Sequence, residues 1–182
     1  MLAGEHVDPS LFEIVKSYGC DNIVKCRILS RYWVSNTCGT VKFDDVFCEV
    51  QKSLTRYFQG ENELKSTYKF HYPIVVGVQP GNGLTPQPSL TFSAVLPEGS
   101  DFPLPTDSRL TVKKWCEMSV YARPFLAHTK EEEYAAECTS FADLLSTVGL
   151  THIAQPYYWV ICEPDDMCKP LPAAQIWFTA ST

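Results

Sequence analysis

The sequence has no long apolar run. Its apolar stretches are strand-sized, such as residues 73–78, whereas a membrane-spanning helix needs about 18 to 20 consecutive apolar residues. We therefore expect no membrane span. The first ten residues, MLAGEHVDPS, also lack the basic start and apolar stretch of a signal peptide. That lack does not decide the compartment, because a processed chain with a new initiator methionine looks the same.

Basic residues are outnumbered, with 15 Lys and Arg against 21 Asp and Glu and a net charge of −6. The charges are scattered, and no block of like charge is long enough to form a basic stripe for phosphates. We therefore expect no nucleic-acid partner.

The common catalytic motifs are missing as well. The sequence contains no G-x-S-x-G, no glycine-rich phosphate loop and no H-E-x-x-H, and its four histidines are far apart along the chain. No C-x-x-C pair occurs, so a structural zinc site is not indicated. We assign no catalytic residues and expect no separate metal ion.

Cysteine, by contrast, is abundant. The eight cysteines are an even number and favour an oxidising compartment, and hence secretion over the cytoplasm. We expect at least one disulfide. A bridge between Cys162 and Cys168 is favoured because the five intervening residues, which include Pro164 and two aspartates, can turn between neighbouring segments.

Two segments show the periodicity of amphipathic helices. In residues 43–58 the apolar positions fall on one helical face, two aspartates lie at the start and Gly60 follows the last turn. Residues 130–148 show a second apolar face, with Thr129 and Glu132 in a T-x-x-E capping box and Gly149 at the end. Each helix has one apolar stripe, so each is expected to lie on a sheet.

Most of the remaining chain alternates like half-buried strands, at residues 27–35, 68–78, 90–96, 110–122, 157–162 and 175–179. The order strand, helix, strand, strand occurs twice, with an offset near 86 residues that relates Tyr72 to Tyr158 and Phe92 to Phe178. We predict a single α+β domain over residues 1–182, with its core at about 12–179. A duplicated β-α-β-β unit closes into a twisted, barrel-like antiparallel sheet with two helices outside. The tryptophans Trp33, Trp115, Trp159 and Trp177 lie in expected strands and are predicted to belong to the core.

Several short motifs resemble one known family. The stretch RYFQGENELKSTYKFHYPIVVGVQPGNG (residues 56–83) is similar to the SOUL, or haem-binding-protein, segment in which a helix ends in a Y-x-Q-G-x-N-E turn and runs into a strand. WVSN (33–36), MSVYARPF (118–125) and QIWF (175–178) follow in family order, and the resemblance covers residues 12–179. It implies a duplicated α+β fold like that of bacterial regulatory effector-binding domains. It also implies a monomer or weak dimer that binds haem or other porphyrins in a shallow groove along the first helix.

Carried over onto this sequence, the resemblance implies ligand-binding residues on the first helix and on the strand that follows it: Cys48, Gln51, Lys52, Thr55 and Arg56, and Phe70, His71 and Tyr72. Arg56 retains a positive charge suited to a carboxylate. Cys48 stands where the family has a basic residue, and Gln51 where it has an apolar one. His71 is either an axial haem ligand or a strand histidine on the polar face, and alternation favours the second.

The leading functional hypothesis is non-catalytic binding of haem, a porphyrin, a bilin or a similar flat apolar ligand. One alternative is an enzyme on the same scaffold that acts on an apolar small molecule. The other is an extracellular interaction module held by disulfides, with a vestigial groove.

Overall fold

The structure is a computed structural model that describes residues 9–19, 22–39, 42–79, 89–163 and 173–181. Its helices are η1 (Pro9–Leu11, one 3-10 turn), α1 (Phe43–Phe58) and α2 (Glu131–Thr147). Its strands are β1 (Phe12–Tyr18), β2 (Ile23–Ile28), β3 (Arg31–Gly39), β4 (Ile74–Gln79), β5 (Ser89–Val95), β6 (Leu110–Trp115), β7 (Met118–Leu126), β8 (His152–Ile161) and β9 (Ala173–Ala180).

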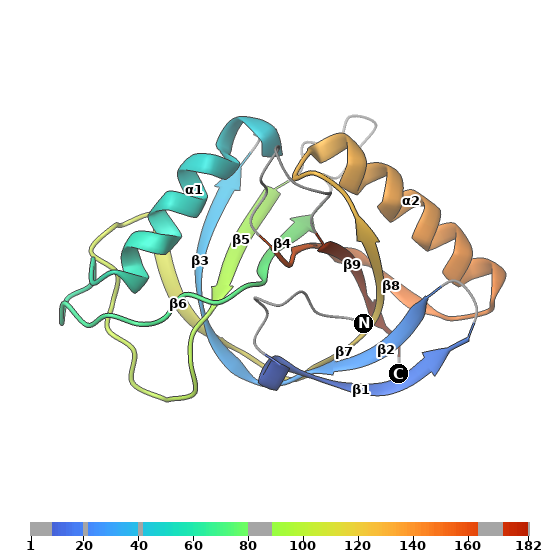
Figure 1. Cartoon of the computed structure of the whole chain (residues 1–182), viewed down its shortest axis with the longest axis horizontal. Coiled ribbons are helices and arrows are strands. Elements are labelled where there is room, and N and C mark those ends of the chain that lie inside the picture. The colour runs from blue at the N-terminus through green and yellow to red at the C-terminus, as the bar shows by residue number, and fades with distance from the viewer. Residues whose placement is uncertain (1–8, 20–21, 40–41, 80–88, 164–172, 182) are drawn as a thin grey trace.

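The strands form one antiparallel sheet in the order β1-β2-β7-β9-β8-β4-β5-β3-β6. Strands β4 and β8 pair at its centre, with β5, β3 and β6 beyond β4 and with β9, β7 and β2 beyond β8. The units β3-α1-β4-β5 and β7-α2-β8-β9 are therefore the two copies of the predicted duplication. Figure 1 shows the sheet curled into a half-barrel with both helices on its outer side, so the predicted α+β architecture is confirmed.

Two long predicted strands are bent in the structure. Residues 27–35 belong to β2 and β3, with a break at Leu29 and Ser30, and residues 110–122 belong to β6 and β7, with a break at Cys116 and Glu117. The two bent ribbons pair with each other along both halves, β2 with β7 and β3 with β6. Strand β1 was not predicted. Most of its side chains are exposed, so it lacks the alternation that would have marked it.

Aromatic side chains form the contact between helices and sheet. Phe43 of α1 stacks on Phe92 of β5 and meets Trp159 of β8 edge-on, while Tyr134 of α2 contacts Trp159 from the other helix. Trp33, Trp159 and Trp177 are buried as predicted, and Trp115 is half-buried. Both helices thus bury their apolar stripes against the outer face of the same sheet.

The predicted capping box of α2 is wrong. Its N-cap is Lys130, which makes no side-chain capping hydrogen bond, and the backbone N–H of Glu131 donates to Asp44 of α1 instead. The constant offset of 86 residues is also wrong for one pair. Tyr72 contacts α1, whereas Tyr158 faces the inner side of the sheet, because residues 154–156 of β8 have no counterpart in β9 and shift the register there.

The described cysteines are free. Cys26, Cys138 and Cys162 are buried, Cys38 is half-buried, and Cys48 and Cys116 are exposed. Cys168, the predicted partner of Cys162, lies outside the described residues, as does Cys20. The structure therefore shows no disulfide among its described residues, and the Cys162–Cys168 bridge stays a prediction.

No helix in the described ranges is long and apolar enough to cross a membrane. Across these same residues, histidine, cysteine and acidic side chains nowhere gather in a group of three or more that could hold a metal ion.

Candidate ligand-binding site

The Q-G-E-N-E turn returns the chain along α1. Gly60 ends the helix with φ +102°, a conformation that disfavours side chains, and a Cβ there would lie only 3.3 Å from the carbonyl oxygen of Lys65. The side-chain amide of Asn62 donates to the carbonyl oxygens of Tyr57 and Ser66, at 3.1 and 2.7 Å. These bonds fold the turn back so that the backbone N–H of Tyr68 reaches the carbonyl oxygen of Phe58 at 2.8 Å. The motif thereby positions residues 68–73 beside the helix.

An aromatic edge lies between α1 and this returning segment. Phe70 meets Phe58 edge-to-face at 5.1 Å and Tyr72 at 5.4 Å between ring centroids. The Nε2 of Gln51 on α1 donates to the hydroxyl oxygen of Tyr72 at 3.1 Å. Burial raises the pKa of Tyr72, and the hydrogen bond from Gln51 partly opposes that rise. This side-chain bond and the backbone bond from Tyr68 to Phe58 thus join helix and segment along an apolar edge in which Tyr72 is buried and Phe70 half-buried.

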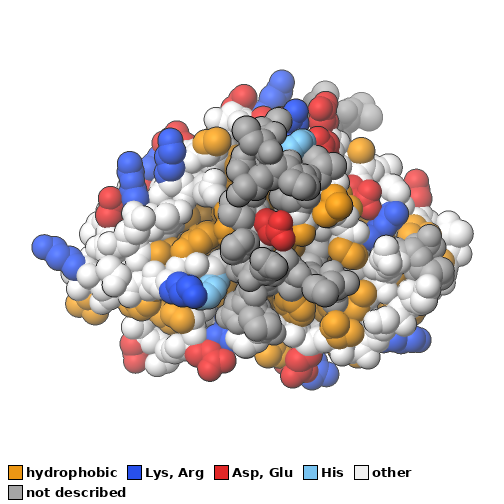
Figure 2. Space-filling model, viewed as in Figure 1, with side chains coloured by type: hydrophobic (Ala, Val, Ile, Leu, Met, Phe, Trp, Pro, Cys, Tyr) orange, Lys and Arg blue, Asp and Glu red, His pale blue; other side chains and the backbone are white. Residues whose placement is uncertain are grey.

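The exposed surface of α1 carries two cations and a thiol. Cys48, Lys52 and Arg56 are all exposed, and Arg56 lies 3.9 Å from Glu61, a loose pair of two exposed groups. In the region of α1, Figure 2 shows basic side chains along the outer edge and hydrophobic side chains between the helix and the centre of the view. We call the surface made by the predicted residues the α1 face: Cys48, Gln51, Lys52, Thr55, Arg56, Phe70, His71 and Tyr72.

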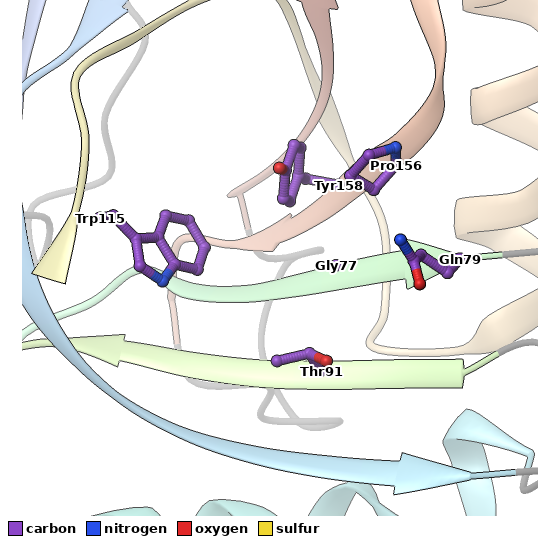
Figure 3. A pocket seen from close by; sticks show the side chains of 6 residues that line it. All are labelled: Gly77, Gln79, Thr91, Trp115, Pro156 and Tyr158. Atoms are coloured by element: carbon purple, nitrogen blue, oxygen red, sulfur yellow. The ribbon is translucent and has the colours of Figure 1, made fainter. Parts of the chain in front are cut away.

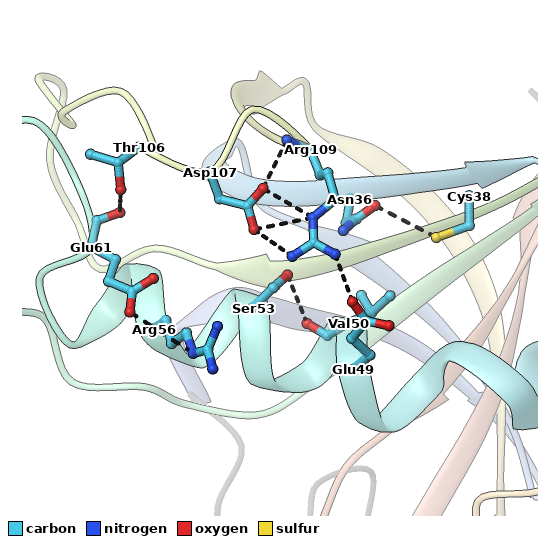
Figure 4. A network of polar contacts seen from close by, with 10 residues as sticks. All are labelled: Asn36, Cys38, Glu49, Val50, Ser53, Arg56, Glu61, Thr106, Asp107 and Arg109. Atoms are coloured by element: carbon cyan, nitrogen blue, oxygen red, sulfur yellow. Dashed lines mark hydrogen bonds and ion pairs between the residues drawn. The ribbon is translucent and has the colours of Figure 1, made fainter.

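A third cation near α1, Arg109, is already paired with carboxylates. Arg109 donates twice to Asp107, through Nε and Nη2, and its Nη1 donates to Glu49 of α1 at 2.7 Å (Figure 4). The guanidinium lowers the pKa of the Asp107 carboxyl by hydrogen bonding and charge. Arg109 therefore fastens the segment before β6 onto the helix, and sequence reasoning missed it because the pairing with Glu49 spans 60 positions.

The structure brings together part of the predicted set. Gln51 and Tyr72 are in contact, and Thr55 uses its hydroxyl within the helix by donating to the carbonyl oxygen of Gln51. His71 is half-buried. The predicted strand over 68–78 begins only at Ile74, so Phe70, His71 and Tyr72 lie on an extended segment that precedes β4.

A pocket that the sequence did not predict lies on the inner face of the sheet. It has a volume of about 260 Å³ and is lined by Gly77, Gln79, Thr91, Trp115, Pro156 and Tyr158 (Figure 3). Trp115 stacks on Trp33 at 4.5 Å and lies 6.0 Å from Tyr158. Gly77 pairs with Tyr158, and the adjacent pair Val76 and Trp159 faces the helices, so alternation directs this pocket away from the α1 face. The one signal in the sequence was a glycine within the valine-rich run 75–78.

Comparison with known proteins identifies a family from the sequence and similar folds among solved structures. The family described as SOUL heme-binding protein matches residues 12–173. Human "Heme-binding protein 2" is 26% identical over 128 residues, which cover 69% of this chain and 62% of that protein. The chain thus spans less than two thirds of the length of this relative.

Two solved structures share the fold. The C-terminal domain of EcmrR superposes with a TM-score of 0.67 at 5% identity, covering 88% of this chain and 97% of that domain. A hydrolase from Listeria innocua gives a TM-score of 0.63 at 10% identity, with coverage of 88% and 92%. At such low identity these likenesses bear on the fold alone.

Proposed function

The chain belongs to the SOUL heme-binding protein family, and from this premise we propose that it holds haem, a porphyrin, a bilin or a similar flat apolar ligand at the α1 face without catalysing a reaction. Two observations support the proposal: the aromatic edge of Phe70 and Tyr72 packs along α1, and the same helix carries the exposed cations Lys52 and Arg56. The name of the human relative, "Heme-binding protein 2", supports the ligand class.

A tetrapyrrole combines a flat apolar ring with carboxylates on one edge, and the α1 face has a partner for each part. The half-buried ring of Phe70, backed by the buried Tyr72, supplies apolar area, and the exposed Lys52 and Arg56 supply positive charge. The pairing of Arg56 with Glu61 is loose at 3.9 Å, so the guanidinium is available to a carboxylate. These two kinds of group support the proposal of a macrocycle that lies against the α1 face.

The affinity is expected to be modest. Apolar burial contributes roughly 25 cal/mol per Å², whereas an exposed ion pair adds only about 0 to 1 kcal/mol. The side-chain amide of Gln51 is already hydrogen-bonded to Tyr72. Gln51 and Thr55 are polar, so they offer a flat ligand less apolar contact area than aliphatic side chains would. We expect a Kd on the order of micromolar, not nanomolar.

Titration of the purified protein with haemin, followed by its Soret absorbance, tests the proposal. Arg56→Glu should weaken binding several-fold, because attraction to the ligand carboxylate becomes repulsion. The matched control is Arg27→Glu on β2, since Arg27 is also exposed and also paired with a glutamate. Added salt should weaken binding by the parent protein and should not weaken binding by Arg56→Glu.

A second variant separates the α1 face from the inner pocket. Gly77→Val places a side chain against the ring of Tyr158, which lies 3.5 Å from a Cβ at that position. Haemin binding that survives Arg56→Glu but is lost in Gly77→Val contradicts the α1 face. Absence of any Soret change in the parent protein contradicts tetrapyrrole binding itself.

The two alternative functions, an enzyme and an extracellular interaction module, have less support. The family match speaks for ligand binding rather than for an enzyme, and the described cysteines provide no disulfide for a stapled extracellular module. We retain the monomer or weak dimer as part of the proposal.

A further inference from the structure

The second half of the duplication has an open groove beside α2. It has a volume of about 370 Å³ and lies between α2 and the outer face of β8 and β9. Its helix side includes Ala135, Thr139 and Ala142, and its strand side includes His152, Tyr157 and Phe178. We call it the α2 groove. In the fold it occupies the position that corresponds to the α1 face, since α2-β8-β9 repeats α1-β4-β5 (Figure 1).

The strand side of the α2 groove is a fixed aromatic wall. The ring centroid of Phe178 lies 4.7 Å from that of His152 and 5.8 Å from that of Tyr157. The fully buried Phe141 packs against Phe178 with a centroid distance of 5.7 Å. A flat ring that enters the groove therefore meets aromatic surface already held in place, which limits the ordering cost of binding.

Short side chains keep the helix side open. On α1 the long amide of Gln51 reaches across to Tyr72 and closes the strip between helix and segment. On α2 the facing residues include two alanines, and the hydroxyl of Thr139 donates back to the carbonyl oxygen of Ala135. Among the described residues, none that lines the groove makes a hydrogen bond across it. The second half thus leaves free the space that the first half bridges.

The groove is lined by one carboxylate, that of Asp143, and its one basic side chain is the imidazole of His152 among the described residues. Asp143 is exposed at its helix side, and no lysine or arginine lines it. Burial raises the pKa of the two other acidic groups, Cys138 and Tyr157, to about 12 each, so both are neutral near pH 7. Asp143 is then the one carboxylate available to a ligand among the described lining residues.

We propose that the α2 groove is a second ligand site, selective for a small planar aromatic cation such as a protonated arylalkylamine. The ring lies against Phe178 and His152, and the ammonium group pairs with Asp143. The volume is near the lower end of ligand pockets, about 300 to 1,000 Å³, which suits a bicyclic ring better than a tetrapyrrole. The site is distinct from the α1 face in location, in ligand size and in ligand charge.

The test uses tryptamine and its neutral analogue tryptophol in titrations followed by ¹H–¹⁵N correlation spectra. Tryptamine should shift the amide signals of Ala142, Asp143 and Ala154 and should bind several-fold more tightly than tryptophol. Asp143→Asn should remove that preference, whereas Glu132→Gln, at an exposed position in the first turn of α2, should retain it.

A pair of matched alanine substitutions tests the location. Ala142→Leu fills the groove and should weaken tryptamine binding by about tenfold or more, while Ala136→Leu, exposed on the same helix outside the groove, should leave it within about twofold. Arg56→Glu should have no effect on tryptamine. Equal affinity for tryptamine and tryptophol, an unchanged affinity in Ala142→Leu, or signal shifts confined to the Trp115–Tyr158 pocket would each overturn the proposal.

Discussion

Asp44 and Glu131 each cap the helix to which the other belongs. The Oδ1 of Asp44, on α1, accepts the backbone N–H of Glu131 at 2.9 Å, and the Oε2 of Glu131, on α2, accepts the backbone N–H of Phe43 at 2.8 Å. Figure 1 shows the two helices starting beside each other on the outer side of the sheet. Each carboxylate also lies near the positive end of a helix dipole. The exchange joins the two halves of the duplication at their helix starts.

This exchange predicts that the two carboxylates matter more than their neighbours. Asp44→Ala and Glu131→Ala should each lower the free energy of unfolding by about 0.5 to 2 kcal/mol, the usual range for a lost N-terminal cap. Glu132→Ala is the control, because Glu132 is exposed in the same turn. Urea unfolding followed by circular dichroism measures all three. Equal stabilities of Asp44→Ala and Glu132→Ala would show that the caps contribute nothing.

A second prediction concerns Gln51. Gln51→Leu exchanges a polar group for apolar area on the α1 face, and we expect haemin affinity to rise several-fold at roughly 25 cal/mol per Å² of added apolar contact. Loss of the bond to Tyr72 should lower the free energy of unfolding by about 0.5 to 1.5 kcal/mol. Haemin titration and urea unfolding of the same sample separate the two effects. Unchanged or weaker haemin binding would mean that the ligand does not contact this part of α1.

His71 provides a third prediction. Because His71 is half-buried on the segment before β4 and the proposed ligand is held mainly by apolar contact and charge, His71→Ala should leave the Soret band of the haemin complex nearly unchanged. Phe70→Ala, which removes a ring from the aromatic edge, is the contrasting variant and should weaken binding several-fold. A lost Soret shift in His71→Ala alone would identify His71 as an axial ligand.

The Asp107–Arg109 pair predicts a pH dependence. The pKa of Asp107 is lowered in the folded protein, mainly by hydrogen bonds from Arg109, so the stabilisation is present above the unfolded-state pKa of about 3.9. It is lost as pH falls below that value and through the lower pKa of the folded state. Asp107→Asn should therefore reduce the free energy of unfolding near pH 7 by at most about 1 kcal/mol, with a difference that shrinks below about pH 4. Thermal unfolding across this range, with Asp101→Asn as control, checks the trend; a constant difference at every pH would contradict it.

Thiol reactivity is the last prediction. Burial raises the pKa of Cys26 to about 11 and of Cys138 and Cys162 to about 12, so at pH 8 these thiols should react slowly with Ellman's reagent. The exposed Cys48 and Cys116 should react fast, and haemin should protect Cys48 but not Cys116 if it lies on the α1 face. Non-reducing mass spectrometry of the same sample shows whether Cys162 and Cys168 are bridged. Equal protection of both exposed thiols would contradict the proposed position.

Local pattern determined much of this protein. The 3.6-residue period and the flanking glycine defined α1 over its full length, since both act within one or two turns of chain, and the repeated order of elements indicated the duplicated sheet. The Q-G-E-N-E turn is likewise a local feature, because Gly60 and Asn62 contact residues only about five positions away along the chain.

Tertiary structure decided what depended on distant partners. Which side of the sheet Tyr158 faces follows from the register against β9, because an odd shift in pairing reverses the face of every later side chain. The exchanged caps of Asp44 and Glu131 and the inner pocket arise where segments from both halves meet, and the α2 groove arises where α2 packs on β8 and β9. Periodicity specifies which side chains share a face, but only packing decides what that face meets.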